Sequence, residues 1–455
     1  MTSRFIVTFL SCFSFIVASQ SDAAQHKLLP TDGKAEDHFG YSVAIDGTTA
    51  LIGAFKADTI QSDTQSKATR QGKVSGGNKS DTGVINDASI IEGTNILEDT
   101  GAAYVFTLDA NGWQQQAKLI ASPAFAHDTL GGNVALKHNM ALLGARNRDD
   151  KGEDAGAVVA FEQQANQWSQ TQILTAIDAK PSDAFGQSIA LTDRFLVIGA
   201  PHSDAPYQDS GSAYVFQRHQ NTWQFHTKLT AVDGASGDLF GISVAIDGDT
   251  ILVGADLNDE KAEKAGAVYA YVFDGKQWRH EAKLMADDGG HTDIFGVRVA
   301  LFGNTALISA RRDDIEGVGK DAGSAYIFER ALISERASGK VKGQWTQTQK
   351  LTAPDGNADD RFARGVALNE NTALISAMHH DAKGENAGAL YVFKKHDKQW
   401  HFSNKITAED GLPQDRFGWN VALSKQTALV AAPHRDDNGN ASGAAYLVEL
   451  GQIRK

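Results

Sequence analysis

The sequence predicts an all-β fold, a seven-bladed β-propeller of four-stranded antiparallel blades. A Phe-Gly pair recurs every 55 residues in the middle of the chain, at Phe185, Phe240 and Phe295. Each copy is followed by short β-branched and aromatic runs of strand length, which Asp-Gly, Asn-Gly or Gly-rich turns separate. No segment shows a sustained helical period of apolar residues. A self-similar period of this kind is typical of repeat architectures.

Each repeat contains four segments, which the first copy illustrates. The pattern Phe-Gly-x-Ser-Val-Ala-Ile occupies 39–45, Thr-Ala-Leu-Ile-Gly-Ala occupies 49–54, and Gly-Ala-Ala-Tyr-Val-Phe occupies 101–106. The fourth segment, 113–120, begins with a Trp and contains a Lys-Leu pair. The seven anchors of the repeat are Phe39, Leu130, Phe185, Phe240, Phe295, Phe362 and Phe417. Four strands in each of seven copies predict seven blades.

The two ends of the repeat array predict how the ring closes. Lys27-Leu28 precedes Phe39 at the spacing that separates Leu119 from Leu130, although no blade lies before it. The last copy stops after Glu449 without a fourth segment. We therefore expect the N-terminal strand to complete blade seven, so that 25–455 is one domain without an open sheet edge at the junction.

Residues 1–24 have the pattern of a cleaved signal peptide. Arg4 precedes an apolar run from Phe5 to Ala18 that is too short to span a membrane, and small residues follow. The alternative is acylation of Cys12, the only cysteine, as in a lipoprotein. The net charge of −13 argues against binding to nucleic acid or anionic lipid. These features predict an exported monomer without a transmembrane span, in the periplasm, at the cell surface or secreted.

The repeats resemble a known family. The Phe-Gly anchors, the Gly199-Ala-Pro201 sequence that ends a second strand, and the following Gly-x-x-Tyr resemble FG-GAP repeats. These repeats form the blades of the integrin α-subunit propeller and occur in many bacterial surface proteins, so the resemblance implies a propeller and suggests adhesion. Several copies depart from the pattern, at Leu130, Ser309, Ala363, Ser376 and Ala431. The Asp-x-Asp-x-Asp-Gly calcium loop of integrin blades is absent, so the resemblance does not extend to calcium binding.

One face of the predicted ring is rich in carboxylates. The loops from strand four to the next strand one and from strand two to strand three share this face, which we call the loop face. Asp residues recur two positions before the anchors and, in six copies, five positions earlier still, as at Asp183 and Asp178. A further Asp follows each second strand; the candidates for a metal site are Asp149, Asp204, Asp259, Asp314, Asp381 and Asp436. They predict either Ca²⁺ coordination or, as repetition in every blade favours, hydrogen bonds to the backbone of their own turns.

Two insertions interrupt the repeat. The insert 56–99 in blade one is polar, belongs to the loop face, and is either functional or disordered. Within it, 84–97 contains enough Ile and Val for a small hairpin. The insert 331–342 in blade five belongs to the opposite face and is expected to be a simple extension of two strands.

Residues that break the sevenfold pattern are the candidates for ligand binding. Trp419 follows a Phe-Gly anchor on an innermost strand, where other blades carry residues such as Gln187 and Arg364. The second-strand loops add basic candidates: Arg146, His202, Arg312, His379 and His434. The alternative interpretation of each is a solvated salt bridge to a neighbouring Asp.

The sequence contains none of the common enzyme motifs, such as a phosphate-binding glycine loop or a Gly-x-Ser-x-Gly elbow. It therefore favours a binding or adhesion module that recognises a protein or glycan through its loop face. Two alternatives stay open. One is an extracellular polysaccharide hydrolase or lyase with acidic residues at the central mouth, and the other is a structural subunit of an envelope complex.

Overall fold

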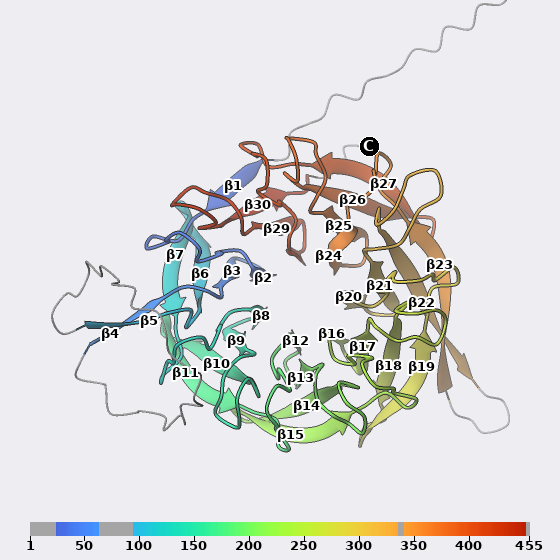
Figure 1. Cartoon of the computed structure of the whole chain (residues 1–455), viewed down its shortest axis with the longest axis horizontal. Helices are drawn as coiled ribbons and strands as arrows, with labels where there is room; N and C mark the ends of the chain where they lie inside the picture. The colour runs from blue at the N-terminus through green and yellow to red at the C-terminus, as the bar shows by residue number, and fades with distance from the viewer. Residues whose placement is uncertain (1–23, 63–93, 335–340, 452–455) are drawn as a thin grey trace, which may run out of the picture.

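A computed structural model describes residues 24–62, 94–334 and 341–451. These residues form seven four-stranded antiparallel sheets around a central axis, as Figure 1 shows, and contain no helix. The predicted all-β, seven-bladed propeller is therefore confirmed. The predicted signal peptide, 1–24, lies outside the described residues except for Ala24.

Within each of the first six blades the strands follow chain order from the axis outwards. Blade one comprises β2 (Ser42–Asp46), β3 (Thr49–Ala54), β6 (Ala102–Asp109) and β7 (Gly112–Leu119); blade two comprises β8 (Asn133–Lys137), β9 (Met140–Ala145), β10 (Ala157–Gln164) and β11 (Gln167–Leu174). Blade three comprises β12 (Ser188–Leu191), β13 (Phe195–Ala200), β14 (Ser212–His219) and β15 (Thr222–Leu229); blade four comprises β16 (Ser243–Asp247), β17 (Thr250–Ala255), β18 (Ala267–Phe273) and β19 (Trp278–Leu284).

The remaining three blades repeat this arrangement. Blade five comprises β20 (Val299–Phe302), β21 (Thr305–Ala310), β22 (Ser324–Ser334) and β23 (Val341–Leu351); blade six comprises β24 (Phe362–Leu368), β25 (Thr372–Ala377), β26 (Ala389–His396) and β27 (Gln399–Ile406). Blade seven comprises β28 (Val421–Ser424), β29 (Thr427–Ala432), β30 (Ala444–Glu449) and, from the other end of the described chain, β1 (Gln25–Leu28).

The strand β1 is the outer strand of blade seven. It pairs antiparallel with β30, with Leu28 opposite Ala445. Lys27 binds Asp410 at 2.8 Å across this blade, and Leu28 is buried between blades one and seven. The two ends of the described chain thus meet in one sheet, which Figure 1 shows at the upper edge of the ring.

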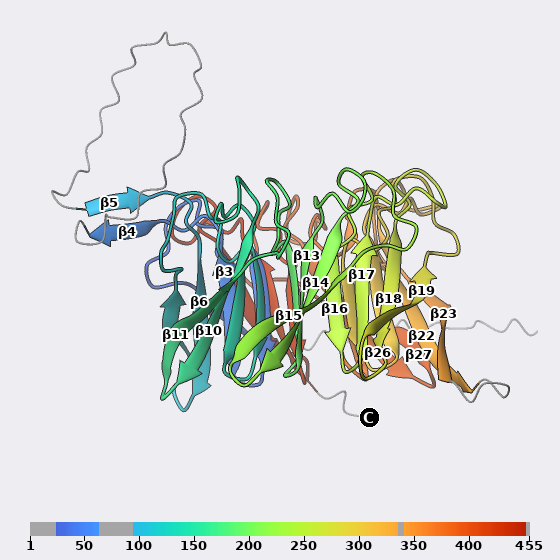
Figure 2. The same cartoon turned by 90° about the horizontal axis from the view of Figure 1, so that it is seen from below.

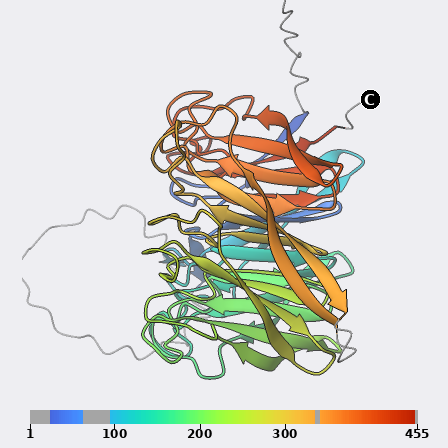
Figure 3. The same cartoon turned by 90° about the vertical axis from the view of Figure 1, so that its right-hand side faces the viewer.

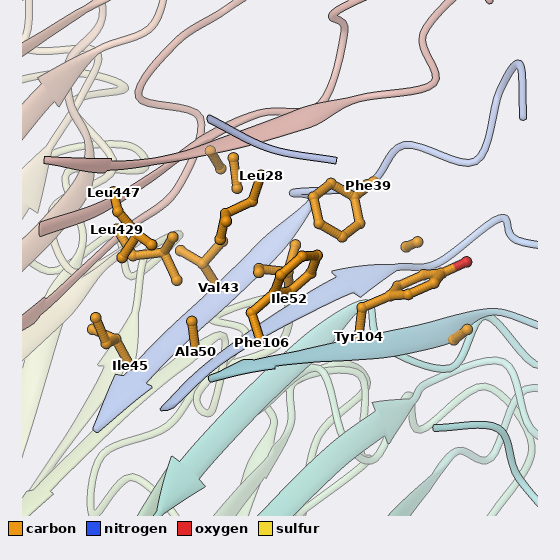
Figure 4. Packing of buried hydrophobic residues seen from close by; sticks show 14 of the residues in the cluster. Leu28, Phe39, Val43, Ile45, Ala50, Ile52, Tyr104, Phe106, Leu429 and Leu447 are labelled. Carbon is orange, nitrogen blue, oxygen red and sulfur yellow. The ribbon is translucent and has the colours of Figure 1, made fainter. Parts of the chain in front are cut away.

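The core consists of layers between adjacent blades. Six of the seven anchors are Phe side chains that are fully buried. In blade one, the ring of Phe39 meets those of Tyr104 and Phe106 edge-on, at centroid distances of 5.5 and 6.0 Å. Figure 4 shows these rings beside Leu429 and Leu447 from blade seven. The aromatic anchor therefore joins the third strand of its own blade to the neighbouring blade.

A glycine at the start of each third strand allows the next blade to approach. Gly211 lies beside Phe240 of the following blade, in a parallel bridge, with φ of +84°. A Cβ atom at Gly211 would lie 2.1 Å from the backbone oxygen of Phe240. The equivalent bridge between Gly443 and Phe39 joins blade seven to blade one.

The two insertions lie on opposite faces of the ring. Thr59–Ser62 (β4) and Thr94–Leu97 (β5) form a two-stranded antiparallel hairpin at the level of the loop face, which Figure 2 shows projecting outwards from the rim of the ring. The predicted 84–97 hairpin is wrong in its pairing, because 94–97 pairs with 59–62; the residues 84–93 lie outside the described residues. In blade five, β22 and β23 extend together to Ser334 opposite Val341 and project from the other side (Figures 2 and 3).

Candidate functional site

A cavity opens at the centre of the loop face. Most of its side chains come from two kinds of position: the residues between the anchor and the innermost strand, and the residue just after the second strand. The rings of Tyr41, Phe55 and Trp419 line one side, where Tyr41 lies 4.2 Å from Phe55 and 5.6 Å from Trp419 between ring centroids. The polar lining residues are Thr129, Asn133, Arg146, Gln187, Arg298 and Asn420.

An arginine cluster adjoins this cavity. We use this name for Arg298 and Arg311 of blade five, Arg364 of blade six and Arg416 before the anchor of blade seven. Arg364 is 8 % exposed, and its guanidinium lies 4.3 Å from the centre of the Trp419 ring. Arg416 lies on the same ring at 5.8 Å. Cation–π contact with Trp419 thus places two like charges beside the cavity.

The cluster is poorly neutralised. Burial, together with the charges of Arg298 and Arg312, lowers the pKa of Arg311 to about 10. Burial and the charges of Arg298 and Arg311 hold the pKa of Arg364 well below its usual range. Among the described residues, the Nε of Arg311 is buried without a hydrogen-bond partner. Mutual repulsion of this kind costs free energy unless an anion is present.

The charge of Asp256, the residue after the second strand of blade four, acts on Arg298 and Arg311. Asp256 is 7 % exposed, and its Oδ1 has no hydrogen-bond partner within the described residues. Burial raises the pKa of Asp256 to about 6, although Arg311 and Arg298 oppose this shift. One buried carboxylate therefore interacts with two guanidinium groups of the cluster.

His434 connects the aromatic side of the cavity to the cluster. Its ring lies edge-on to Trp419 at 5.6 Å and to His38 at 5.3 Å. Burial and the charge of Arg416 lower the pKa of His434 to about 4, so the ring is neutral at pH 7. Its Nε2 then accepts a hydrogen bond from Arg416 at 3.3 Å. His434 thus orients Arg416 without adding charge.

The structure divides the predicted binding residues into two groups. Trp419, Arg146 and His434 come together around the central cavity, where Arg146 also donates to Gln187 at 3.0 Å. His202 lies further out, in a hollow that Arg146 also lines, and contacts Asp209 at 3.0 Å.

The other two predicted residues lie away from the cavity wall. Arg312 lines a separate acidic hollow in blade five, beside Asp293 and Asp314. The Nδ1 of His379 lies 3.1 Å from the backbone oxygen of Asp359. Neither side chain lines the central cavity.

The Asp residues after the second strands serve their own loops. Asp204, for example, accepts the backbone N–H of Asp209 at 3.1 Å, and Asp259 accepts that of Lys264 at 2.6 Å. The same bond recurs at Asp58, Asp149, Asp314, Asp381 and Asp436. In the part of the chain that the structure describes, no group of three or more His, Cys, Asp or Glu side chains is arranged to hold a metal ion.

In most of the loops that lead into a blade, the first recurring position of the repeat is an Asp that binds a Tyr and a Lys, and this triad recurs from blade to blade. Asp178 accepts hydrogen bonds from Tyr214 and Lys228, both at 2.7 Å, which lower its pKa although burial opposes this. In blade seven the triad is Asp410, Tyr446 and Lys27, and its lysine comes from β1. These carboxylates bind the third and fourth strands to the loop, which explains the Gly-x-x-Tyr and Lys-Leu patterns.

Sequence reasoning missed part of the cluster. Arg298 and Arg416 flank the anchors at positions where other blades carry varied residues. Arg364 occupies the repeat position of Trp419, so the signal was a break in the repeat at this position in two adjacent blades. Their convergence depends on the ring, which brings residues from different blades, such as Arg364 and Trp419, to one axis.

Comparison with known proteins identifies the repeats. The model of the family described as "FG-GAP repeat" matches residues 23–69, 113–161, 168–216, 223–273, 278–328, 345–393 and 400–448. Each match from the second onwards begins in the fourth strand of one blade and ends in the third strand of the next, and the first begins with β1. A search of curated proteins found no match.

Solved structures add only a distant likeness. A chain from a structure titled "Crystal Structure of Mitotic Checkpoint Complex" is 11 % identical, with a TM-score of 0.49, and the alignment covers 99 % of this chain and 100 % of that one. A likeness at this level carries no argument about function. No helix of the described residues is long and apolar enough to cross a membrane.

Proposed function

Because the chain belongs to the FG-GAP repeat family, we propose that it is an exported binding module that recognises its ligand at the centre of the loop face. The observation that carries this proposal is the central cavity, where the rings of Tyr41, Phe55 and Trp419 converge with side-chain amides from other blades. Ligand sites in general combine apolar or aromatic walls with a few convergent polar groups. These residues lie at or next to the ends of the first and second strands of their blades, so the closed ring fixes their positions around the axis.

The nature of the lining supports a glycan as the ligand. Asn133, Gln187 and Asn420 supply amide donors and acceptors suited to hydroxyl groups. The neighbouring rings supply apolar faces. None of the residues that line this cavity is Leu, Ile, Val or Met, which a pocket for apolar peptide side chains would need.

A saccharide-binding screen tests this function. The chain beginning at Ala24 is applied to an array of oligosaccharides and compared with the variant Trp419→Ala. We expect the variant to lose binding by at least about tenfold, since an aromatic wall contributes on the order of 1–2 kcal/mol. Trp168→Ala, on the outer strand of blade two, is the control. Equal binding by Trp419→Ala would contradict the central site.

Export is the second part of the proposal. The apolar run from Phe5 to Ala18 after Arg4 supports it. N-terminal sequencing of the secreted or periplasmic protein tests it, with a first residue between Ser19 and Gln25 expected. A protein that retains Met1 in the cytoplasm would contradict export.

A further inference from the structure

We infer that the central site recognises an acidic saccharide, with the arginine cluster binding its carboxylate or sulfate group. This inference rests on the proposed function and names the ligand class of the same site. The starting observation is a contrast of charge. The chain as a whole carries a net charge of −13, yet four arginines, Arg298, Arg311, Arg364 and Arg416, gather at one point of its axis.

The cluster has unused hydrogen-bonding capacity. Within the described residues, the guanidinium of Arg364 forms no hydrogen bond or ion pair, although only 8 % of the residue is exposed. Arg298 donates only to a backbone oxygen, that of Val297 at 2.9 Å. The Nε of Arg311 is buried without a partner. Guanidinium groups in this condition match the planar, bidentate geometry of a carboxylate or sulfate.

Two buried arginines elsewhere in the described chain are paired with carboxylates. Arg148 is 1 % exposed and binds Asp128 at 2.8 Å and Asp150 at 2.5 Å. Arg435 likewise binds Asp415 at 2.7 Å. The fold therefore pairs buried arginines where they serve structure. The cluster differs because, among the described residues, Asp256 acts on Arg298 and Arg311 through its charge and forms no ion pair with either.

Arg298 connects the cluster to the cavity. It lines the cavity together with Trp419, and its charge acts on both Arg311 and Arg364. Arg364 and Arg416 both lie on the Trp419 ring. A saccharide in contact with the rings and amides would thus place an acidic substituent within reach of the guanidinium groups. An acidic peptide would fit less well, because this cavity lacks aliphatic lining residues.

Titration calorimetry with an oligogalacturonate trisaccharide tests the inference, with a neutral galactose trisaccharide, inorganic sulfate and a Glu-rich hexapeptide as comparison probes. We expect the acidic trisaccharide to bind at least about tenfold more tightly than the other three, since charged hydrogen bonds contribute about 1.5–3 kcal/mol. Raising NaCl from about 0.1 to about 0.5 M should weaken only the acidic ligands.

Three variants locate the interaction. Arg298→Gln and Arg416→Gln should each weaken the acidic trisaccharide about tenfold or more, without changing the affinity for the neutral one. Asp256→Asn should strengthen the acidic trisaccharide severalfold, because it removes the negative charge beside the cluster. Arg279→Gln, on the outer strand of blade four, is the control and should behave like the wild type. Thermal melts verify that each variant is folded.

Each contrary result has a distinct meaning. Equal binding of the neutral and acidic trisaccharides, lost in Trp419→Ala, would overturn the inference and leave the proposed function standing. Tighter binding of the hexapeptide, or binding of sulfate alone, would overturn the assignment to an acidic saccharide. If no saccharide on the array and none of the probes binds, both the inference and the proposed function fail.

Discussion

Individual carboxylates in this propeller have opposite electrostatic roles. Hydrogen bonds from a Lys and a Tyr lower the pKa of Asp178, against the effect of burial, and the same holds for Asp233, Asp288, Asp355 and Asp410. These groups stabilise the fold above their ordinary pKa of 3.8, and that stability is lost as the pH falls through their lower folded values. Burial raises the pKa of Asp256 to about 6, so the stability that Asp256 contributes to the fold decreases as the pH rises from about 4 to about 6.

The variant Asp256→Asn should therefore be stabilised in a pH-dependent way. The folded-state pKa of Asp256 is raised, so the wild type gains stability from its protonation below pH 4 and loses it as the pH rises through about 6. Asn resembles the protonated form at every pH. We expect almost no difference in unfolding free energy at pH 4 and a gain of about 3 kcal/mol at pH 7. Urea unfolding at both values measures this; equal effects at the two values would contradict it.

The Asp residues after the second strands are expected to be fixtures of their turns rather than calcium ligands. Each accepts a backbone N–H of its own loop, as Asp381 does from Asn386 at 2.8 Å. We predict the same melting temperature in EDTA and in millimolar calcium. Calcium at 100 times its Kd would add roughly 2.7 kcal/mol to the stability. A clear upward shift would show a calcium site and reverse this interpretation.

At the scale of the blade, close contact of backbones joins one element to the next. Ser243 on β16 donates a hydrogen bond to the backbone oxygen of Gly296, the glycine of the next anchor, at 2.7 Å. Ser42 and Ser188 make the same bond to their neighbouring blades. Where Ser309 replaces the second-strand glycine, its hydroxyl binds Ala363 of blade six instead. The replacement of glycine by Ser309 thus keeps a hydrogen bond between neighbouring blades.

The glycine at the start of the third strand should be intolerant of any side chain. Gly211→Ala would combine a positive φ of +84° with a Cβ only 2.1 Å from the Phe240 oxygen. We expect a loss of about 3 kcal/mol or more, because the next blade must shift. Gly237→Ala is a matched control: its φ is +83°, but nothing lies within 4 Å of the added Cβ.

Chemical denaturation of the two glycine variants separates the cost of the left-handed backbone conformation from the cost of the contact between blades. The control should lose only the cost of the left-handed backbone, about 1–2 kcal/mol. Equal losses in Gly211→Ala and Gly237→Ala would show that backbone conformation alone requires glycine there. In that case the contact between blades would not limit the substitution.

At the scale of the whole molecule, β1 occupies the outer edge of blade seven. It supplies the lysine of that blade's triad and the buried side chain of Leu28. We predict that removing Gln25–Pro30 destabilises the entire ring, because β30 loses its outer partner and one edge is exposed. Differential scanning calorimetry of chains that begin at Ala24 and at Thr31 measures this. Equal melting temperatures would contradict a role of β1 in stability.

Much of the architecture follows from the sequence. The recurrence of the Phe-Gly pair predicts the number of blades, since each copy carries strand segments that bury their apolar faces only against neighbours. The spacing of Lys27 before Phe39 predicts a strand in the position that β1 occupies. Residues that recur in every repeat make their contacts within one repeat or between adjacent repeats. The local sequence pattern is therefore enough to predict their structural roles.

The candidate site depends on the tertiary structure. Trp419 was found because it interrupts the repeat. Arg298 also interrupts it, at the Ser position after the anchor, whereas Arg416 precedes its anchor at a position that varies between blades. Only closure of the ring brings both within electrostatic reach of Arg364, with Arg298 in the wall of the cavity and Arg416 against the Trp419 ring. The sequence by itself determined the fold and its joints, because these depend on near neighbours in the chain. The tertiary structure alone decided which charges converge, because that depends on distances across the axis.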